Sequence, residues 1–127
     1  MELRKYERQK ITNTETFNDG IAYVYKIVNT AEPGFKPQYT PTLYRKFAFG
    51  YKTIGVKRNY EALQAQVKLD ELIQILLDRR ISAQDIVVIN EVQYQIKQVQ
   101  HKKDTVPFTT LLSLVKLEED YDDLGIR

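Results

Sequence analysis

Short runs in which apolar and polar residues alternate recur along this 127-residue chain, and turn-forming residues separate them. In the run 21–28, Ile21, Tyr23, Tyr25 and Ile27 share one face, and smaller residues occupy the other. A period of two is typical of a β-strand. These patterns predict further strands at 11–17, 43–56, 86–89, 92–99 and 108–117, with Asn90 and Glu91 as a hairpin turn.

Residues 67–77 fit two structures. As a helix, they would continue a short helix predicted at about 59–66, which Asn59 caps, and their apolar residues would form one stripe. As a strand, they alternate with one defect. Local propensity favours the helix, and the residues alone leave both structures open.

Five or six short strands with one short α-helix predict a mainly β fold, a small antiparallel β-barrel or sandwich. The chain is long enough to close one hydrophobic core, and no segment resembles an interdomain linker. We therefore expect a single domain, 1–127. It would have an N-terminal arm at 1–10, a β-barrel core at 11–117 and a flexible acidic C-terminal tail at 118–127.

A long proline-rich loop is predicted at 29–42. It contains Pro33, Gly34, Pro37 and Pro41. Proline removes backbone donors and restricts the residue before it, so we do not expect a continuous strand here. A loop of this length is either functional or a tolerated surface excursion, and the sequence leaves both open.

The charge of the chain argues against one class of partner. The 19 Lys and Arg residues nearly balance the 17 Asp and Glu residues, which gives a net charge of +2. A protein that binds duplex DNA by bulk charge carries a larger basic excess. The two ends are nevertheless polarised, because residues 1–10 are mainly basic and residues 118–123 hold five carboxylates.

Side chains suited to catalysis are scarce. Without cysteine, the chain has neither a disulfide nor a cysteine-type zinc site. The one histidine, His101, lies in a lysine-rich predicted turn, and no phosphate-binding, dinucleotide-binding or metalloprotease motif occurs. The C-terminal carboxylates lack the spacing of a calcium loop. We therefore expect no enzyme activity, no metal site and no cofactor.

Membrane insertion is not expected either. No apolar run approaches the roughly 20 residues needed to cross a bilayer. The first ten residues lack the apolar core of a signal peptide, so we expect the chain to fold in the cytoplasm.

One segment offers an alternative function. Phe47, Phe49, Tyr51 and Lys52 interleave aromatic and basic residues, as in surfaces on which single-stranded nucleic-acid bases stack. The chain would then be a small β-barrel that binds single-stranded nucleic acid. The competing interpretation, which we favour, is an amphipathic strand with its aromatic rings inward and its cations in water.

The order of features after residue 59 resembles a known family. Residues 60–66 read Y-x-A-x-Q-x-Q. A strand follows, then Arg80 with Ile81, the stretch D-I-V-V at 85–88 and the hairpin 89–96. The head–tail joining, or head-closure, proteins of long-tailed bacteriophages have a Y-x-A-Q-Q helix, a strand, an I-x-x-x-D/M-R-V approach and a G-x-x-Y-x-I hairpin. The resemblance covers about 11–117 and is sharpest over 59–99. The chain departs from the family in its hairpin turn, where a glycine is usual, and in its longer 29–42 loop.

The resemblance implies that 68–77 is a strand and that the helix ends near residue 66. It also implies a structural virion protein of the phage neck, or connector. Such proteins form a homo-oligomeric ring, often dodecameric, below the portal, which closes the DNA-filled head and provides the tail attachment surface. The partners would be further copies, the portal or adaptor protein, and a tail terminator or tail-completion protein. Packaged DNA would be contacted only non-specifically, and assembly would take place in the host cytoplasm.

Candidate sites follow from the same resemblance. By position, the 29–42 loop would gate the channel or dock on the portal or tail, through Pro33, Gly34, Phe35, Lys36, Pro37 and Tyr39. A ring repeats one heterologous contact, so the polarised ends would supply its two sides. These candidates are Arg4, Lys5, Arg8 and Lys10 at one end and Glu118, Glu119, Asp120, Asp122 and Asp123 at the other.

Overall fold

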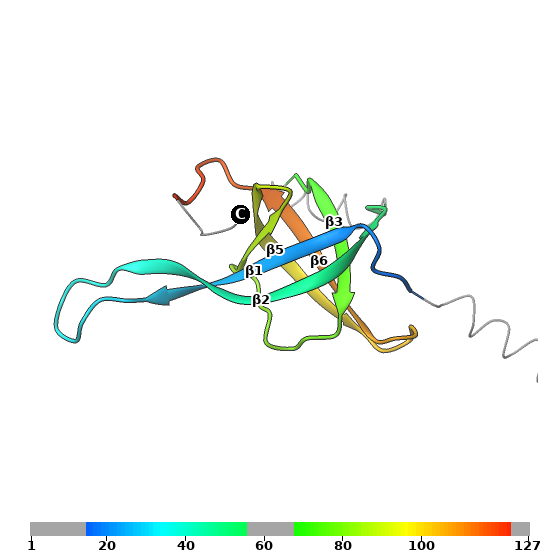
Figure 1. The fold of residues 1–127 in the computed structure, drawn as a ribbon, viewed down its shortest axis with the longest axis horizontal. Helices are drawn as coiled ribbons and strands as arrows, with labels where there is room; N and C mark the ends of the chain where they lie inside the picture. Colours follow the sequence, from blue (N-terminus) through cyan, green and yellow to red (C-terminus); the bar gives the residue numbers. More distant parts are fainter. Residues whose placement is uncertain (1–14, 56–67, 123–127) are drawn as a thin grey trace, which may run out of the picture.

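Six antiparallel strands close into a β-barrel in the computed structural model, which describes residues 15–55 and 68–122 (Figure 1). The mainly β fold and the antiparallel barrel are thereby confirmed. The order around the barrel is β1-β2-β3-β6-β5-β4. The strands are β1 (Gly20–Asn29), β2 (Tyr39–Lys52), β3 (Glu71–Leu76), β4 (Ile86–Ile89), β5 (Val92–Lys102) and β6 (Thr109–Lys116).

Within the described ranges no helix is present. The helix expected at about 59–66 lies outside these ranges, as do the N-terminal arm expected at 1–10 and the last five residues of the expected tail. Among residues 15–55 and 68–122, no segment forms a helix of the length and apolarity that a membrane span needs.

The inside of the barrel is lined by the smaller residues of β1. Ala22 and Val24 are fully buried there and pack with Phe47 and Phe49 of β2. A narrow barrel has room for few large side chains, so small residues on one strand offset the rings on its neighbour. The other strands and one loop complete this core with Ile73, Ile75, Ile81, Val87, Ile89, Ile96, Leu112 and Leu114.

The larger residues of β1 lie on the outer surface of the barrel. Tyr25 is buried there in a second cluster with Ile86 and Val88, and Tyr23 packs against them. The pairing of β1 with β4 over Tyr23–Tyr25 brings these side chains together. Both faces of β1 are therefore covered at this point, and alternation identified the strand without identifying its internal face.

The ambiguous stretch 67–77 contains a strand. β3 pairs with β6 along its whole length, and with β2 at Gly50–Lys52. A strand buried on both faces need not alternate cleanly, which is why the pattern left helix and strand open while local propensity favoured the helix. The prediction from the resemblance, that this stretch is a strand, is confirmed. The consecutive buried residues are Leu72, Ile73, Gln74 and Ile75.

The predicted β4–β5 hairpin is also confirmed. Asn90 and Glu91 have φ angles of +50° and +67°, as in a type I′ turn, whose twist matches that of the flanking strands. β5 continues to Lys102, three residues beyond the expected end. The prediction that His101 lies in a turn is therefore wrong, because this residue pairs with Thr110 of β6.

The predicted loop at 29–42 is too long. β1 extends to Asn29 and β2 begins at Tyr39, so the connection is 30–38. Pro41 lies inside β2, opposite Ile27. Its prolines suggested a loop throughout, but a strand tolerates proline where no ladder hydrogen bond requires its nitrogen.

Of the strand predicted at 11–17, only residues 15–17 are described, and they are not part of a strand; residues 11–14 lie outside the described ranges. Residues 15–17 instead pack against the ends of β2 and β3. The Gln74 amide donates to the Thr16 carbonyl at 3.0 Å, and Glu15 accepts from Lys52 at 3.2 Å. A Cβ atom on Gly50 would lie 2.6 Å from the Thr16 oxygen, so glycine is required at this close approach.

Candidate docking arm

The hairpin of β1 and β2 extends well beyond the barrel. Figure 1 shows the two strands continuing away from it as a ribbon that ends in a loop. β1 pairs with β4 only over Tyr23–Tyr25, and β2 pairs with β3 only over Gly50–Lys52. Beyond these contacts the two strands pair with each other alone. We call residues 26–42 the β1–β2 arm and residues 30–38 its tip.

The tip is ordered by local hydrogen bonds. The Phe35 amide donates to the Glu32 carbonyl at 3.1 Å, with Pro33 and Gly34 between them and a φ of +88° at Gly34. This is the arrangement of a type II turn, which needs glycine at its third position. The Asn29 side-chain oxygen accepts from the amides of residues 31 and 38. The prolines, the turn and these bonds restrict the tip before it meets a partner.

Large apolar side chains on the arm are exposed to solvent. Phe35 at the tip is 70% exposed and Tyr39 at the start of β2 is 64% exposed. Val28 and Leu43 are also exposed along the ribbon. Aromatic side chains held in water at the end of a projecting element are typical of a protein-binding surface.

A cluster of polar residues fixes the arm to the barrel. The Lys26 ammonium of β1 donates to the Asp85 carboxylate at 2.6 Å and to the Arg80 carbonyl. The same ammonium lies 5.3 Å from the centre of the Tyr44 ring. The Tyr44 hydroxyl in turn donates to Asp78 at 2.9 Å. These contacts join β1 and β2, at the base of the arm, to the connection between β3 and β4, and we call these residues the arm-base cluster.

Asp78 is a member of the arm-base cluster whose pKa is shifted. Its burial alone would raise the pKa of this carboxyl. Hydrogen bonds from the Arg80 amide and the Tyr44 hydroxyl, with a weaker contact from Arg45, outweigh burial and hold the pKa of Asp78 below its usual value. The residue is therefore a carboxylate at neutral pH, and its charge orients the donors around it. The Asp78 amide also donates to the Thr110 hydroxyl at 3.0 Å, which ties the cluster to β6.

The charge of the tip suits contact with protein better than contact with DNA. Residues 30–38 contain one acid, Glu32, and one base, Lys36, so they carry no net charge. Binding to phosphates depends mainly on excess cations. Apolar side chains on a neutral, ordered loop instead favour desolvation against a complementary protein surface.

The structure brings the predicted loop residues together and places the described acidic residues elsewhere. Pro33, Gly34, Phe35, Lys36, Pro37 and Tyr39 all lie at or beside the tip. Among the acidic candidates, residues 118–122 follow β6 and are exposed. The Gln93 side chain of β5 holds this segment by two hydrogen bonds of 2.9 Å with the Tyr121 backbone. Arg4, Lys5, Arg8, Lys10 and Asp123 lie outside the described residues.

Two of the three aromatic rings of the alternative nucleic-acid face are buried and cannot stack on bases. Phe47 is 8% exposed and Phe49 is 1% exposed, and both belong to the barrel core. Tyr51 is exposed at the end of the strand and contacts Phe49 edge-on at 4.9 Å between ring centres. Lys52 pairs with Glu15. The competing interpretation, with Phe47 and Phe49 inward, is therefore confirmed, because closing the barrel requires these rings to fill it.

No constellation of catalytic or metal-binding groups is visible in the part of the chain that the structure describes. His101 has its Nδ1 atom 2.9 Å from the Thr110 hydroxyl, which is an ordinary contact across neighbouring strands. Within the same residues, no group of three or more His, Asp or Glu side chains converges on a point where a metal ion could bind.

Sequence reasoning missed the arm-base cluster. Lys26 has the same strand parity as the buried Ala22 and Val24, and a lysine on that face needs a carboxylate partner. That parity was the available signal. Asp78 and Asp85, near the two ends of the β3–β4 connection, were the candidates for this carboxylate partner.

The comparisons with known proteins leave the family open. No protein-family model matches the chain, and a search of curated proteins found no match.

Proposed function

We propose that this chain is a structural protein of the neck of a long-tailed bacteriophage. Copies of it form a ring below the portal, close the DNA-filled head and provide the surface to which the tail attaches. The proposal combines the resemblance over residues 59–99 with the absence of catalytic motifs from the sequence. A compact barrel that carries a projecting docking element also suits a subunit whose work is to connect other proteins.

The β1–β2 arm is the observation that carries this proposal. It projects from a closed barrel, it is fixed at its base, and it exposes Phe35 and Tyr39 at its end (Figure 1). Its exposed apolar groups are unfavourable in water, so their burial against a partner protein would be favourable. We assign the tip to docking on the portal or on the tail protein, and we assign no DNA gate to it because it is electrically neutral.

The test is attachment to DNA-filled, portal-bearing capsids that lack tails. The wild-type chain is incubated with these capsids, the capsids are sedimented, and the attached rings are imaged by electron microscopy. The variant Phe35→Ser with Tyr39→Ser should fold normally and attach at least about tenfold less, which is the loss expected for two aromatic anchors.

The matched control is Val106→Ser with Phe108→Ser. These two apolar residues are exposed in the connection between β5 and β6, away from the arm. The control variant should attach like the wild type. A wild-type chain that ignores the portal, or a tip variant that attaches as well as the control, would count against the proposal.

A further inference from the structure

A groove opens in the barrel wall where β2 and β3 separate. The two strands pair only over Gly50–Lys52, and before that point the outer edge of β2 diverges from β3. A cavity of about 300 Å³ fills the gap, and a second of about 410 Å³ shares Arg45 and Leu77 with it. We call the two together the seam groove.

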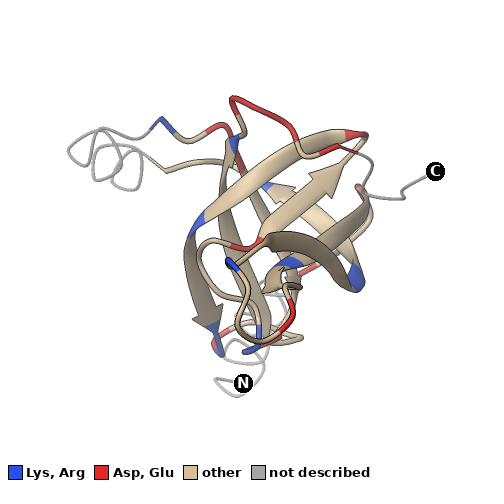
Figure 2. Cartoon of the chain, turned by 90° about the vertical axis from the view of Figure 1, so that its left-hand side faces the viewer, with Lys and Arg blue, Asp and Glu red and all other residues tan. Residues whose placement is uncertain are grey.

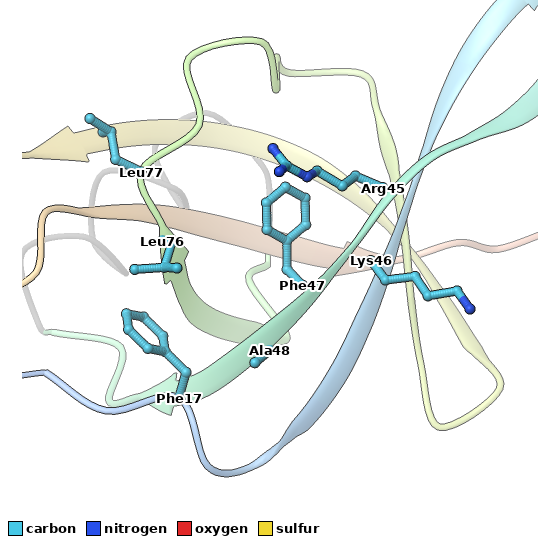
Figure 3. A pocket seen from close by; sticks show the side chains of 7 residues that line it. All are labelled: Phe17, Arg45, Lys46, Phe47, Ala48, Leu76 and Leu77. Atoms are coloured by element: carbon cyan, nitrogen blue, oxygen red, sulfur yellow. The ribbon is translucent and has the colours of Figure 1, made fainter.

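The seam groove has an apolar floor and a basic rim. Figure 3 shows Phe17, Phe47 and Leu76 around the opening, with Arg45 extending over it and Lys46 directed away. The second cavity adds the exposed Arg79 and Arg80. Floor and rim together suit a short acidic segment with at least one apolar or aromatic side chain.

The cations of the rim are only partly neutralised within the chain. Arg45 approaches Asp78 at 3.5 Å, and its side chain remains 64% exposed. Among the described residues, no salt bridge to Arg79 or Arg80 is formed. Asp78 therefore pairs with only one of the three arginine side chains that line the groove, and the groove retains positive charge for a partner.

The acidic segment 118–122 has the complementary character. It contains four carboxylates and Tyr121, whose side chain is exposed while Gln93 holds its backbone. In Figure 2 the acidic residues form a run at the top of the barrel, on the segment that leads to the C-terminal end. The segment is thus an ordered, negatively charged projection rather than a free tail over these five residues.

The groove and the acidic segment lie on opposite sides of one molecule. In the closed strand order, β2 and β5 are separated by two strands in each direction. Figure 1 shows the orange-to-red end of the chain at the top, whereas the connection after β3 lies at the bottom. A segment held on β5 cannot reach the groove of its own chain, but it can reach the groove of a neighbour.

We infer that the seam groove receives residues 118–122 of a second copy of this chain. The contact is heterologous, because it joins different surfaces of the two copies, and repetition of such a contact builds a ring when the rotation closes. The inference specifies the subunit contact of the ring and rests on the proposed function. From the sequence, the basic N-terminal residues are expected to meet the acidic end of a neighbouring copy. In this inference Arg45, Arg79 and Arg80 take that role instead.

Disulfide trapping tests the contact, because the natural sequence has no cysteine. Arg79→Cys and Glu119→Cys chains are mixed, oxidised and separated by non-reducing electrophoresis. The mixture should give about tenfold more linked dimer than a control mixture of Lys103→Cys with Glu119→Cys, since docking raises the effective concentration of the two thiols. Lys103 is exposed and lies in the connection between β5 and β6.

A chain that carries both Arg79→Cys and Glu119→Cys should give a ladder of dimers, trimers and larger species. A dimer alone would mean a closed two-fold contact and would overturn the heterologous arrangement. Charge reversal gives a second measurement. In the chain that carries both cysteines, Arg45→Glu with Arg80→Glu should abolish the ladder, and adding Glu118→Lys with Asp120→Lys should restore it. A yield equal to that of the Lys103 control, or a failure of this restoration, would overturn the inference.

The two proposals fail separately. If the disulfide forms but the chain does not attach to portal-bearing capsids, the proposed neck function is contradicted and the contact between copies is still supported. If the chain attaches but the disulfide does not form, the neck function is still supported and the seam groove is contradicted as the subunit contact of the ring.

Discussion

Removing the carboxylate of Asp78 should weaken both the barrel and the attachment of the arm. This residue is buried and receives hydrogen bonds from the Tyr44 hydroxyl at 2.9 Å and the Arg80 amide at 2.9 Å. Asp78→Ala leaves both donors without their acceptor. The cluster then loses the link between β2 and the β3–β4 connection, and the base of the arm becomes free to move.

The expected cost can be estimated from these bonds. A hydrogen bond to a charged group contributes about 1.5–3 kcal/mol, and water can reach the half-buried Tyr44 and the exposed Arg80 after the substitution. We therefore take the lower part of the range for each bond and expect a total loss of about 3 kcal/mol. Loss of the ion pair between Asp78 and the exposed Arg45 adds little to this destabilisation. A loss of this size should lower Tm by about 10 °C in a domain of this length.

Urea unfolding and thermal melting measure the loss, and a double-mutant cycle assigns it. Tyr44→Phe alone should cost about 1 kcal/mol, and the double variant should lose about 1 kcal/mol less than the sum of the single losses. The matched control is Asp104→Ala at an exposed position, where we expect a change within about 0.5 kcal/mol. An Asp78→Ala variant as stable as this control, or a coupling of zero with Tyr44, would refute the reasoning.

Three further predictions concern the barrel itself. Gly50→Ala should cost about 2 kcal/mol, because its Cβ would meet the Thr16 carbonyl, whereas Gly55→Ala, with open space around it, should change the unfolding free energy little. Glu91→Gly should raise the unfolding free energy by about 0.5 kcal/mol, because glycine adopts this positive φ without strain; a lower Tm would contradict the turn geometry. Stability should fall on acidification. Hydrogen bonds outweigh burial and lower the pKa values of Glu15 and Asp78, so their stabilisation is complete above the unfolded pKa near 4 and disappears as the pH falls through the folded values. A urea midpoint that is unchanged between neutral pH and about pH 3 would contradict this sign.

Alternation and turn residues were sufficient to predict most of the barrel. They work where one face of a strand is buried and the other meets solvent, and where a turn needs residues such as Asn90. They do not decide β3, which is covered on both faces and alternates only with a defect. There the strand followed from the resemblance and not from the local residues.

The candidate site was predictable only in part. The tip could be located because Pro33 and Gly34 are strong turn signals. Its attachment could not, because Lys26, Asp78 and Asp85 come together only when β1 passes the connection between β3 and β4. Contacts that depend on the closed sheet leave little trace in a local pattern. The seam groove is of the same kind, since it exists only because two paired strands separate.

The open edge of β2 in the arm carries a proline, which disfavours pairing with a strand of another molecule. The Thr30 amide donates to the Gln38 carbonyl at 2.8 Å, which marks a hydrogen-bonded pair. Such pairs alternate along an antiparallel ladder, so the pair of Ile27 with Pro41, three steps away, is a non-hydrogen-bonded one. The Pro41 nitrogen therefore faces the open edge of β2, where a donor to an added strand is missing. The edge of the arm therefore disfavours the addition of a strand, and its tip exposes Phe35 and Tyr39. We expect a partner to bind the arm through these side chains. This is why we assign docking to the tip and not to the backbone edge of the ribbon.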